Sequence, residues 1–252
     1  MTNFALEKEK NMAQKVDDLL IIPDVHGRDF WKDAVEKYSD LDVIFLGDYM
    51  DPYSNSIESI SNSEALENFK ELLEFKHKNN NRAVMLLGNH DMHYMSDDFF
   101  DMARGSRFSY SMQPKLEKLF HDNEKCFQLA YEVEYEGQHV LFTHAGVTAV
   151  WLKTHKDLLE VPDARHINAL LHSPGGIAAL ASIGPCRGGF DEAGGILWAD
   201  MSEVATEQAI PGCYQIFGHT QQREQPVITP QFANLDCRRA FLLSEVMKEA
   251  KA

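Results

Sequence analysis

The sequence predicts an α/β protein in which two packed, mixed β-sheets form a sandwich flanked by helices. Three observations lead to this prediction: short apolar runs that stop at polar residues, helical spacing between the early runs, and alternating runs later in the chain. Strand–helix–strand order at the start indicates a sheet that begins largely parallel. The later alternation indicates hairpins and a second sheet.

Five apolar runs end at residues that suit metal or phosphate chemistry. Each is rich in Val, Ile, Leu or Phe, and its length fits a strand that is buried on both faces. A buried helix is the alternative for any single run, but the Gly that follows most of them fits a strand ending in a tight turn. The runs are 19–22, 43–46, 84–87, 140–142 and 214–217.

Helical spacing follows the first two runs, over 30–38 and 65–76, with Ser61 and Ser63 as candidate N-caps. Residues 127–135 alternate, turn at 136–137 and lead into the fourth run, which predicts a β-hairpin. We expect short strands at 227–228, 232–233 and 240–243, and helices broken by loops over 162–195. The stretch 92–123, rich in Asp, Arg and Ser, is expected to be a helical insertion near the site.

The composition is typical of one soluble domain. A chain of 252 residues can form one large domain or two small ones, and we expect a single domain over 1–252 with its core at about 19–245. No apolar run approaches the roughly 18 residues of a membrane span. Four scattered cysteines without a C-x-x-C pair predict reduced thiols and a cytoplasmic location. The net charge of −15 disfavours nucleic-acid polymers and membranes as partners.

Polar residues at the ends of the five runs can form one metal site. Ligands bind beyond the carboxyl ends of the strands in an open α/β sheet, so these residues should meet there. Carboxylate and amide oxygens with imidazole nitrogens, and no thiolate, suit Mn, Fe or Zn. The set exceeds what one ion needs, and a carboxylate such as Asp48 can bridge two ions that clamp a displacement at phosphorus. The residues are Asp24, His26, Asp48, Asn89, His90, His144 and His219.

The charge of such a site predicts an anionic substrate. Two divalent ions and two carboxylates leave it net positive, which favours a phosphate ester over a cationic ligand. His90 follows Asn89 directly, and Asp51 lies three residues after Asp48. A carboxylate that holds this histidine in one tautomer would make it a suitable general acid for an alkoxide leaving group.

Five motifs in chain order resemble those of the calcineurin-like metallophosphoesterases. Within that superfamily they are most similar to the branch of phosphoprotein phosphatases and symmetrical diadenosine tetraphosphatases. The motifs extend over about residues 19–240 and are D-x-H-G at 24–27, G-D-x-x-D at 47–51, G-N-H-D at 88–91, T-H-A-G at 143–146 and G-H-T at 218–220. The resemblance implies a four-layer fold, a β-sandwich between helices, and two divalent metal ions, Mn first with Fe or Zn as alternatives.

The resemblance also implies a role for each of these residues. One metal ion would be held by Asp24, His26 and Asp48. The second would be held by Asp48, Asn89, His144 and His219. The acid pair would be His90 with Asp51.

The chain departs from the family pattern at the phosphate contact. In protein phosphatases an Arg follows G-D-x-x-D and holds the substrate phosphate, whereas Pro52 stands there in this chain. Arg187 and Arg28 are the candidate replacements, and a surface arginine is the alternative interpretation of each. Trp198, in a segment similar to one in protein phosphatases, is expected in the core rather than as a platform for substrate.

These observations predict a metal-dependent phosphoric ester hydrolase. Its expected substrates are phosphate monoesters, including phosphoserine and phosphothreonine in proteins, attacked by metal-bound hydroxide. Symmetrical hydrolysis of dinucleoside polyphosphates such as diadenosine tetraphosphate is the alternative, and a nuclease ranks third because of the acidic charge. A non-catalytic interaction module on the same fold is the alternative from another class, although it would need neither the ligands nor the acid pair.

Overall fold

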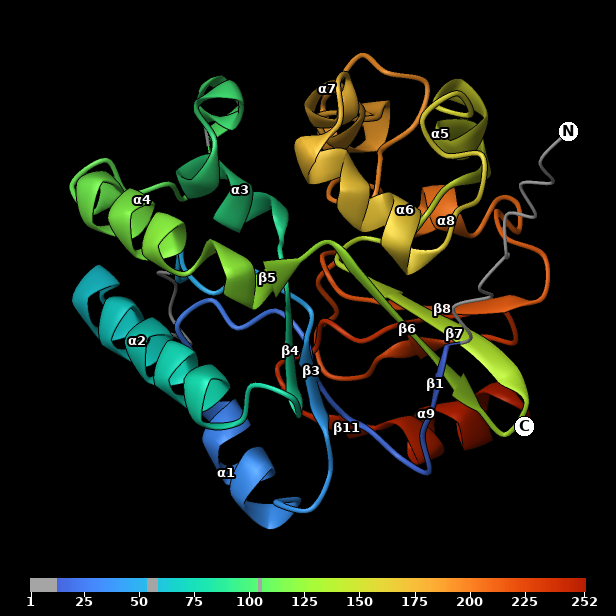
Figure 1. Cartoon of the computed structure of the whole chain (residues 1–252), viewed down its shortest axis with the longest axis horizontal. Coiled ribbons are helices and arrows are strands. Elements are labelled where there is room, and N and C mark those ends of the chain that lie inside the picture. Colours follow the sequence, from blue (N-terminus) through green and yellow to red (C-terminus); the bar gives the residue numbers. More distant parts are fainter. Residues whose placement is uncertain (1–12, 54–58, 104–105) are drawn as a thin grey trace, which may run out of the picture.

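Two mixed β-sheets pack against each other with helices on both outer sides, which confirms the predicted fold class (Figure 1). The structure is a computed structural model and describes residues 13–53, 59–103 and 106–252. Within these ranges one sheet has five strands in the order β11-β2-β3-β4-β5 and the other has six in the order β1-β6-β7-β8-β10-β9.

The five-stranded sheet contains the first three predicted strands side by side and parallel. Ile22 pairs with Phe45, and Phe45 pairs with Met85, so the carboxyl ends of these strands lie at one edge. Its members are β2 (Leu20–Ile22), β3 (Val43–Phe45), β4 (Ala83–Leu86), β5 (Phe127–Gln128) and the antiparallel edge strand β11 (Phe241–Leu242).

The six-stranded sheet contains the other two predicted strands, which are also parallel neighbours, with Phe142 opposite Ile216. A turn at Glu136 and Gly137, both with positive φ, joins the predicted hairpin. Its members are β1 (Gln14–Lys15), β6 (Ala130–Tyr135), β7 (Gln138–Thr143), β8 (Cys213–Phe217), β9 (Val227–Ile228) and β10 (Phe232–Asn234).

Two helices cover the outer face of the five-stranded sheet. They are α1 (Phe30–Lys37) and α2 (Asn62–Lys78), close to the predicted helices. Trp31 of α1 and Phe75 of α2 both pack on Phe45 of β3. Ser61, not Ser63, is the N-cap of α2, because its hydroxyl accepts from the Glu64 N–H while the Glu64 carboxylate accepts from the Ser61 N–H.

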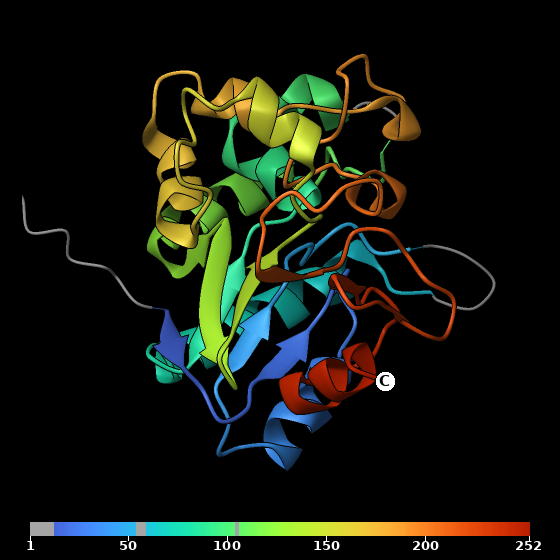
Figure 2. The same cartoon turned by 90° about the vertical axis from the view of Figure 1, so that its right-hand side faces the viewer.

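The stretch 92–123 holds the end of α3 (Asn89–Met95), the 3-10 helix η1 (Asp97–Ala103) and α4 (Gln113–Asp122), before a short η2 (Glu124–Cys126). Short helices cover the six-stranded sheet beside α3 (Figure 2). These are α5 (Ala149–Thr154), α6 (Ala164–Ala169), η3 (Leu170–His172), α7 (Gly176–Leu180), η4 (Pro185–Arg187) and α8 (Met201–Val204).

Successive side chains along the strands point to opposite faces of the sheet, so the core has one part between the sheets and another under the outer helices. Ile21 and Ile44 face the six-stranded sheet, whereas Leu20 and Ile22 face the helices outside. The last helix, α9 (Leu243–Ala250), packs Leu243, Val246 and Met247 into the layer between the sheets.

Two local predictions were wrong. Phe127 does not begin the hairpin but pairs with Met85 in the five-stranded sheet. The predicted strand 240–243 is shorter, and α9 begins at Leu243, because apolar residues at i, i+3 and i+4 give this segment one apolar helical face.

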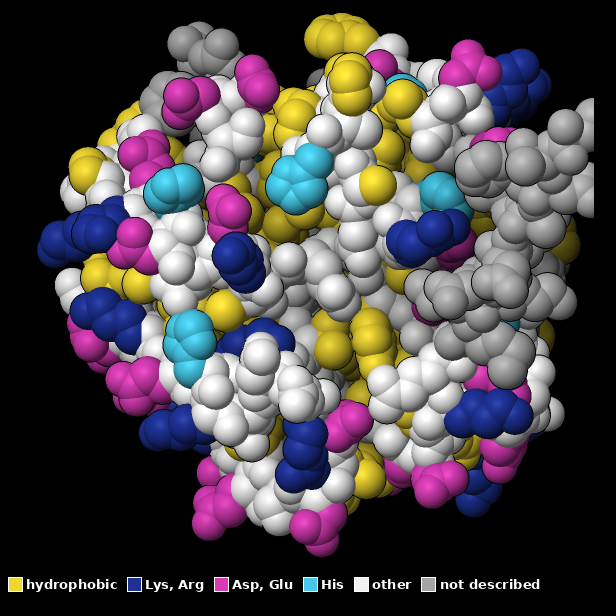
Figure 3. All heavy atoms as spheres, viewed as in Figure 1, with side chains coloured by type: hydrophobic (Ala, Val, Ile, Leu, Met, Phe, Trp, Pro, Cys, Tyr) yellow, Lys and Arg dark blue, Asp and Glu magenta, His cyan; other side chains and the backbone are white. Residues whose placement is uncertain are grey.

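Acidic and basic side chains are interspersed over the face seen in Figure 3. No helix in the described ranges is both long enough and apolar enough to cross a membrane.

Candidate metal centre

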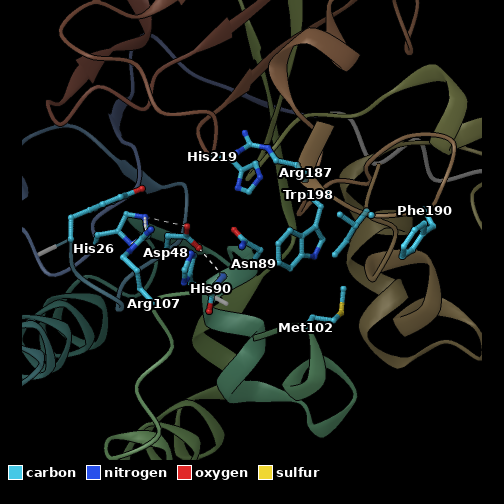
Figure 4. Close-up of a pocket in the computed structure, with 15 residues that line it drawn as sticks. His26, Asp48, Asn89, His90, Met102, Arg107, Arg187, Phe190, Trp198 and His219 are labelled. Carbon is cyan, nitrogen blue, oxygen red and sulfur yellow. Dashed lines mark hydrogen bonds and ion pairs between the residues drawn. The ribbon is translucent and has the colours of Figure 1, made fainter. Parts of the chain in front are cut away.

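The predicted strand-end residues gather around one cavity. Loops after β2, β3, β4, β7 and β8 supply them, since the carboxyl ends of these strands meet at one edge of the sandwich. The cavity has a volume of about 640 Å³. Figure 4 shows five of the predicted side chains on its wall: His26, Asp48, Asn89, His90 and His219.

Unusual backbone conformations position these side chains. Among the described residues, six other than glycine have a positive φ, and four of the six belong to the predicted site. L-residues rarely adopt this conformation, and it persists where the surroundings hold it. The four residues are His26, Asp48, Asp51 and His219.

Backbone hydrogen bonds hold these strained loops together. The His26 N–H donates to the Asp48 carbonyl at 2.6 Å, and the His219 N–H donates to the Asp24 carboxylate at 3.0 Å. Asp91, the last residue of the G-N-H-D motif, was given no role from the sequence. Its carboxylate accepts the N–H groups of Gly88, Asp48 and Tyr49 at 2.8–3.0 Å, so it ties the loop after β4 to the loop after β3.

The glycines of these motifs permit close approach to the carboxylates. A Cβ atom at Gly88 would overlap the Asp48 carboxylate, and one at Gly218 would overlap the Asp24 carboxylate. Only glycine therefore lets the backbone pass beside these two acids.

Carbonyl groups fix the tautomers of two histidines. The His26 ring directs Nδ1 to the Met50 carbonyl at 2.9 Å, and the His144 ring directs Nδ1 to the Leu46 carbonyl at 2.8 Å. Each Nδ1 must carry the proton to donate to a carbonyl. Each Nε2 then presents a lone pair, 3.4 and 3.6 Å from the same carboxylate oxygen of Asp48.

Further candidate ligand atoms lie around His144 Nε2. His144 Nε2 lies 3.1 Å from Asn89 Oδ1 and 3.2 Å from His219 Nδ1, and His219 Nε2 is buried with no partner among the described residues. Among the described residues, three sets of donor side chains have ligand atoms that lie within 4.8 Å of one another, and one of the three is Asp51, His90 and His93. The other two sets share Asp48. They are Asp24, His26, Asp48 and Asp48, His144, His219. Clustered acceptors of this kind fit divalent cations.

Burial determines the charge state of the donors. It lowers the pKa of His26 and His219 well below the usual value, so both imidazoles are neutral, as metal ligands must be. Burial also raises the pKa of Asp24 to about 6. At Asp48 burial acts in the same direction, but the histidines around it, His144 first, hold its pKa below the usual value.

The predicted acid pair lies beside these donors. His90 Nδ1 is 2.7 Å from Asp51 Oδ2, and the Tyr94 hydroxyl donates to Asp51 Oδ1 at 2.5 Å. Burial and the Asp51 charge raise the Tyr94 pKa, so this hydroxyl remains a donor. Tyr94 was not predicted from the sequence, since a tyrosine in a helix carries no signal of its own.

The two predicted arginines lie in different places. Arg187 lines the cavity, and its Nη2 donates to Thr220 Oγ1 at 2.7 Å and lies 3.1 Å from Asp200 Oδ2. Arg28 is buried, with Nη1 3.4 Å from the Asp24 carbonyl and its guanidinium 5.1 Å from the centre of the Tyr53 ring.

A third arginine, Arg107, was missed. Its guanidinium stacks 3.6 Å from the centre of the Tyr53 ring, its Nε donates to the Asp51 carbonyl at 2.9 Å, and its Nη2 lies 3.3 Å from His26 Nε2. It lines the cavity but is far from the motifs along the chain, in a stretch without apolar periodicity. Trp198, expected in the core, is half-buried and also lines the cavity: its ring packs against the core but still reaches the wall.

The chain is similar to known phosphoesterases in sequence pattern and in fold. Residues 18–223 match the family model described as calcineurin-like phosphoesterase. No curated protein sequence matches this chain. One similar structure is that of a cold-active protein tyrosine phosphatase, with 16% sequence identity over 92% of this chain and 75% of that chain, and a TM-score of 0.54.

Another similar structure is a protein serine/threonine phosphatase from Saccharomyces cerevisiae with similarity to human phosphatase PP5. It shares 14% sequence identity over 86% of this chain and 66% of that chain, with a TM-score of 0.51. At these sequence identities, the two structures show similarity to this chain in fold alone.

Proposed function

Because the chain belongs to the calcineurin-like phosphoesterase family, whose members are phosphoric ester hydrolases that use two metal ions, we propose that it hydrolyses phosphate monoesters. The observation that supports this most directly is the convergence of imidazole, amide and carboxylate lone pairs on Asp48, next to a hydrogen-bonded His–Asp pair. A binding module would require neither feature.

The donors present fit two divalent ions. One ion would be held by Asp24, His26 and Asp48. The other would be held by Asp48, Asn89, His144 and His219. When bound, such a pair activates water and offsets the negative charge that develops at phosphorus.

Two arginines would bind the phosphoryl oxygens. Arg107 and Arg187 both line the cavity that holds the metal donors (Figure 4). Their guanidinium groups can each donate two hydrogen bonds to phosphate, so they supply the contact for which Pro52 leaves no arginine after the second motif. Tyr53 and the Asp51 carbonyl hold Arg107, and Thr220 and Asp200 hold Arg187.

His90 would supply the proton for the leaving group. The Asp51 carboxylate accepts a hydrogen bond from His90 Nδ1 and so fixes the imidazole ring. The Nε2–H group of His90 is then left to donate to the ester oxygen as the bond to phosphorus breaks. Tyr94 holds the other oxygen of Asp51 and so keeps the carboxylate in place.

A substrate panel tests the proposal. With Mn²⁺ added, the chain should hydrolyse p-nitrophenyl phosphate and a phosphoserine peptide faster than bis(p-nitrophenyl) phosphate. Faster turnover of diadenosine tetraphosphate than of every monoester would instead show that dinucleoside polyphosphates are the substrates of this chain.

A substitution of Asp48, paired with a control substitution at the surface, tests whether this carboxylate bridges two metal ions. Asp48→Asn removes a charge from between two cations, so activity should fall by about a thousandfold or more and metal content should drop. Asp157→Asn, at an exposed position, is the control and should change neither. Full activity with two metal ions still bound in the Asp48 variant would exclude the dinuclear assignment.

A further inference from the structure

The cavity continues beyond the metal donors into an apolar wall. This wall consists of Met102, Ile183, Phe190 and Trp198. Figure 4 labels Met102, Phe190 and Trp198. Trp198 connects the two parts, since its ring centre lies 6.2 Å from that of His219. In Figure 4 it lies between the metal donors on one side and Phe190 on the other. A group that extends from a bound phosphate would therefore meet this wall.

Phe190 is fully exposed, at 103% of its reference area. With Met102, Ile183 and Trp198 it forms an apolar area in the lining of a polar cavity, and apolar areas with a polar rim are typical of binding sites. The turn that carries Phe190 is held by several hydrogen bonds, so the exposed position of the ring is a feature of an ordered turn. Gly188 and Gly189 donate to the carbonyls of Pro185 and Gly184 at 3.0 and 3.1 Å, and Ile183 and Asp191 bond to each other twice.

The same turn carries Arg187, three residues before Phe190. Arg187 is anchored to Thr220 and to Asp200, and Asp200 lies two residues after Trp198. The proposed phosphate contact and the two aromatic side chains thus belong to one cross-linked unit. A phosphate held by Arg187 would place its organic substituent in the cavity that both rings line.

Trp198 also has an unused polar group. Its Nε1 atom is buried and has no hydrogen-bond partner among the described residues. A buried donor without an acceptor is destabilising, so this N–H is suited to an acceptor that arrives with a ligand.

We propose that the apolar wall binds an aromatic ring in the leaving group of the substrate. A phosphate monoester has one organic substituent, so a group held on this wall beside the phosphate must be the leaving group. Flat rings pack well against Trp and Phe side chains, and His90 lines the same cavity to protonate the ester oxygen. The enzyme would then prefer monoesters with a ring close to the ester oxygen, as in phosphotyrosine, over small alkyl phosphates. This inference rests on the proposed function.

Benzyl phosphate and methyl phosphate test the inference. Both leave as alkoxides of similar basicity, so the ratio of their kcat/KM values reports the ring contact rather than intrinsic reactivity. Phe190→Ala should lower this ratio roughly tenfold and leave methyl phosphate unaffected, whereas Phe190→Leu should lower it less. Val161→Ala removes an exposed apolar side chain outside the cavity wall and should leave the ratio unchanged.

Binding gives a second measurement that does not depend on turnover. Trp31 and Trp151 are buried, so a change in tryptophan fluorescence reports mainly on the half-buried Trp198. Benzylphosphonate should shift the emission and bind more tightly than methylphosphonate, and Phe190→Ala should reduce that difference.

Different results would contradict the proposed function and the aromatic site. Hydrolysis of neither ester would contradict the proposed function. Hydrolysis of both with equal kcat/KM, or a ratio that Phe190→Ala does not change, would overturn the aromatic site and leave the function standing.

Discussion

Asp51 organises the proton donor of the site. It accepts from His90 on one oxygen and from Tyr94 on the other, and its own carbonyl accepts from Arg107. Its backbone has a positive φ of 57°, so the chain adopts an unfavourable conformation to bring these groups together. One residue thus links the proposed acid to a proposed phosphate contact.

The role of His90 predicts a dependence on the leaving group. His90→Asn should lower kcat by about 10²–10⁴ with an alkyl phosphate, which needs a proton to leave. The loss should be much smaller with p-nitrophenyl phosphate, whose phenolate departs without one. His121→Asn, which alters an exposed histidine, is the control. Equal losses for both esters would show that His90 has a positional role instead.

The two cavity arginines predict losses in kcat/KM without loss of metal. Arg107→Ala and Arg187→Ala should each weaken kcat/KM for an aryl phosphate by about 1.5–3 kcal/mol, the range for a hydrogen bond to a charged group. Elemental analysis should find the metal content of both variants unchanged. Arg28→Ala is the comparison, and a loss confined to that variant would move the phosphate contact to the first motif.

At the scale of single elements, the strands of the six-stranded sheet are joined by side chains as well as backbone. His139 of β7 pairs in register with Cys213 of β8, and its Nε2 lies 3.1 Å from Glu132 of β6. Hydrogen bonds to Cys213 and to Glu132 raise the pKa of His139 from its usual 6.5 to about 10. The imidazolium therefore ties three neighbouring strands.

This histidine predicts a pH dependence of stability. A folded-state pKa above the unfolded value means that the interaction stabilises fully below about pH 6.5 and is lost as pH rises through about 10. The difference in the free energy of unfolding between wild type and His139→Gln should shrink across this window, as measured by urea denaturation. In a Glu132→Gln background the difference should change less with pH. A difference that is flat from pH 6.5 to 10 would contradict the assigned pairing.

Elements with a strong local signal could be predicted from the sequence. The five apolar runs became β2, β3, β4, β7 and β8, because buried strands need side chains that are apolar on both faces. The polar residues after these runs could be placed near one another because ligands bind beyond the carboxyl ends of the strands in such a sheet. Arg107 could not, since nothing local marks an arginine whose position is set by the Tyr53 ring and the Asp51 carbonyl. Phe127 was assigned to the wrong sheet because alternation shows which faces are buried but not which strand is the neighbour.

At the scale of the whole molecule, the site lies where the two sheets meet. β2, β3 and β4 of one sheet and β7 and β8 of the other supply its residues, so metal ions bound there would join the two halves of the sandwich. The carboxylates of Asp24 and Asp48 are both buried there and lie close enough to repel each other. Cations between them would relieve that repulsion.

Removal of metal should therefore lower the thermal stability of the whole chain. A ligand at a hundred times its Kd stabilises by about 2.7 kcal/mol, which corresponds to roughly 5–10 °C in Tm for a protein of this size. Chelation should lower Tm by about this amount, and added Mn²⁺ should restore it. In the Asp48→Asn variant the change in Tm on chelation should be smaller. An unchanged Tm in the wild type would show that the donors bind no ion tightly.

The contacts between glycines and carboxylates in the centre also restrict how the chain can vary. Any side chain at Gly88 would occupy the place of the Asp48 carboxylate, and the same holds for Gly218 and Asp24. A larger residue at either glycine would fit only if the aspartate were replaced by a smaller side chain, and no side chain smaller than that of Asp carries a carboxylate that could bind the ions. Neither member of a pair can therefore change first without loss of activity. This epistasis leaves the centre easy to lose by one substitution and hard to rebuild in an altered form. The exposed side chain of Phe190 is under no such restriction, so the proposed preference among esters can change while the centre stays the same.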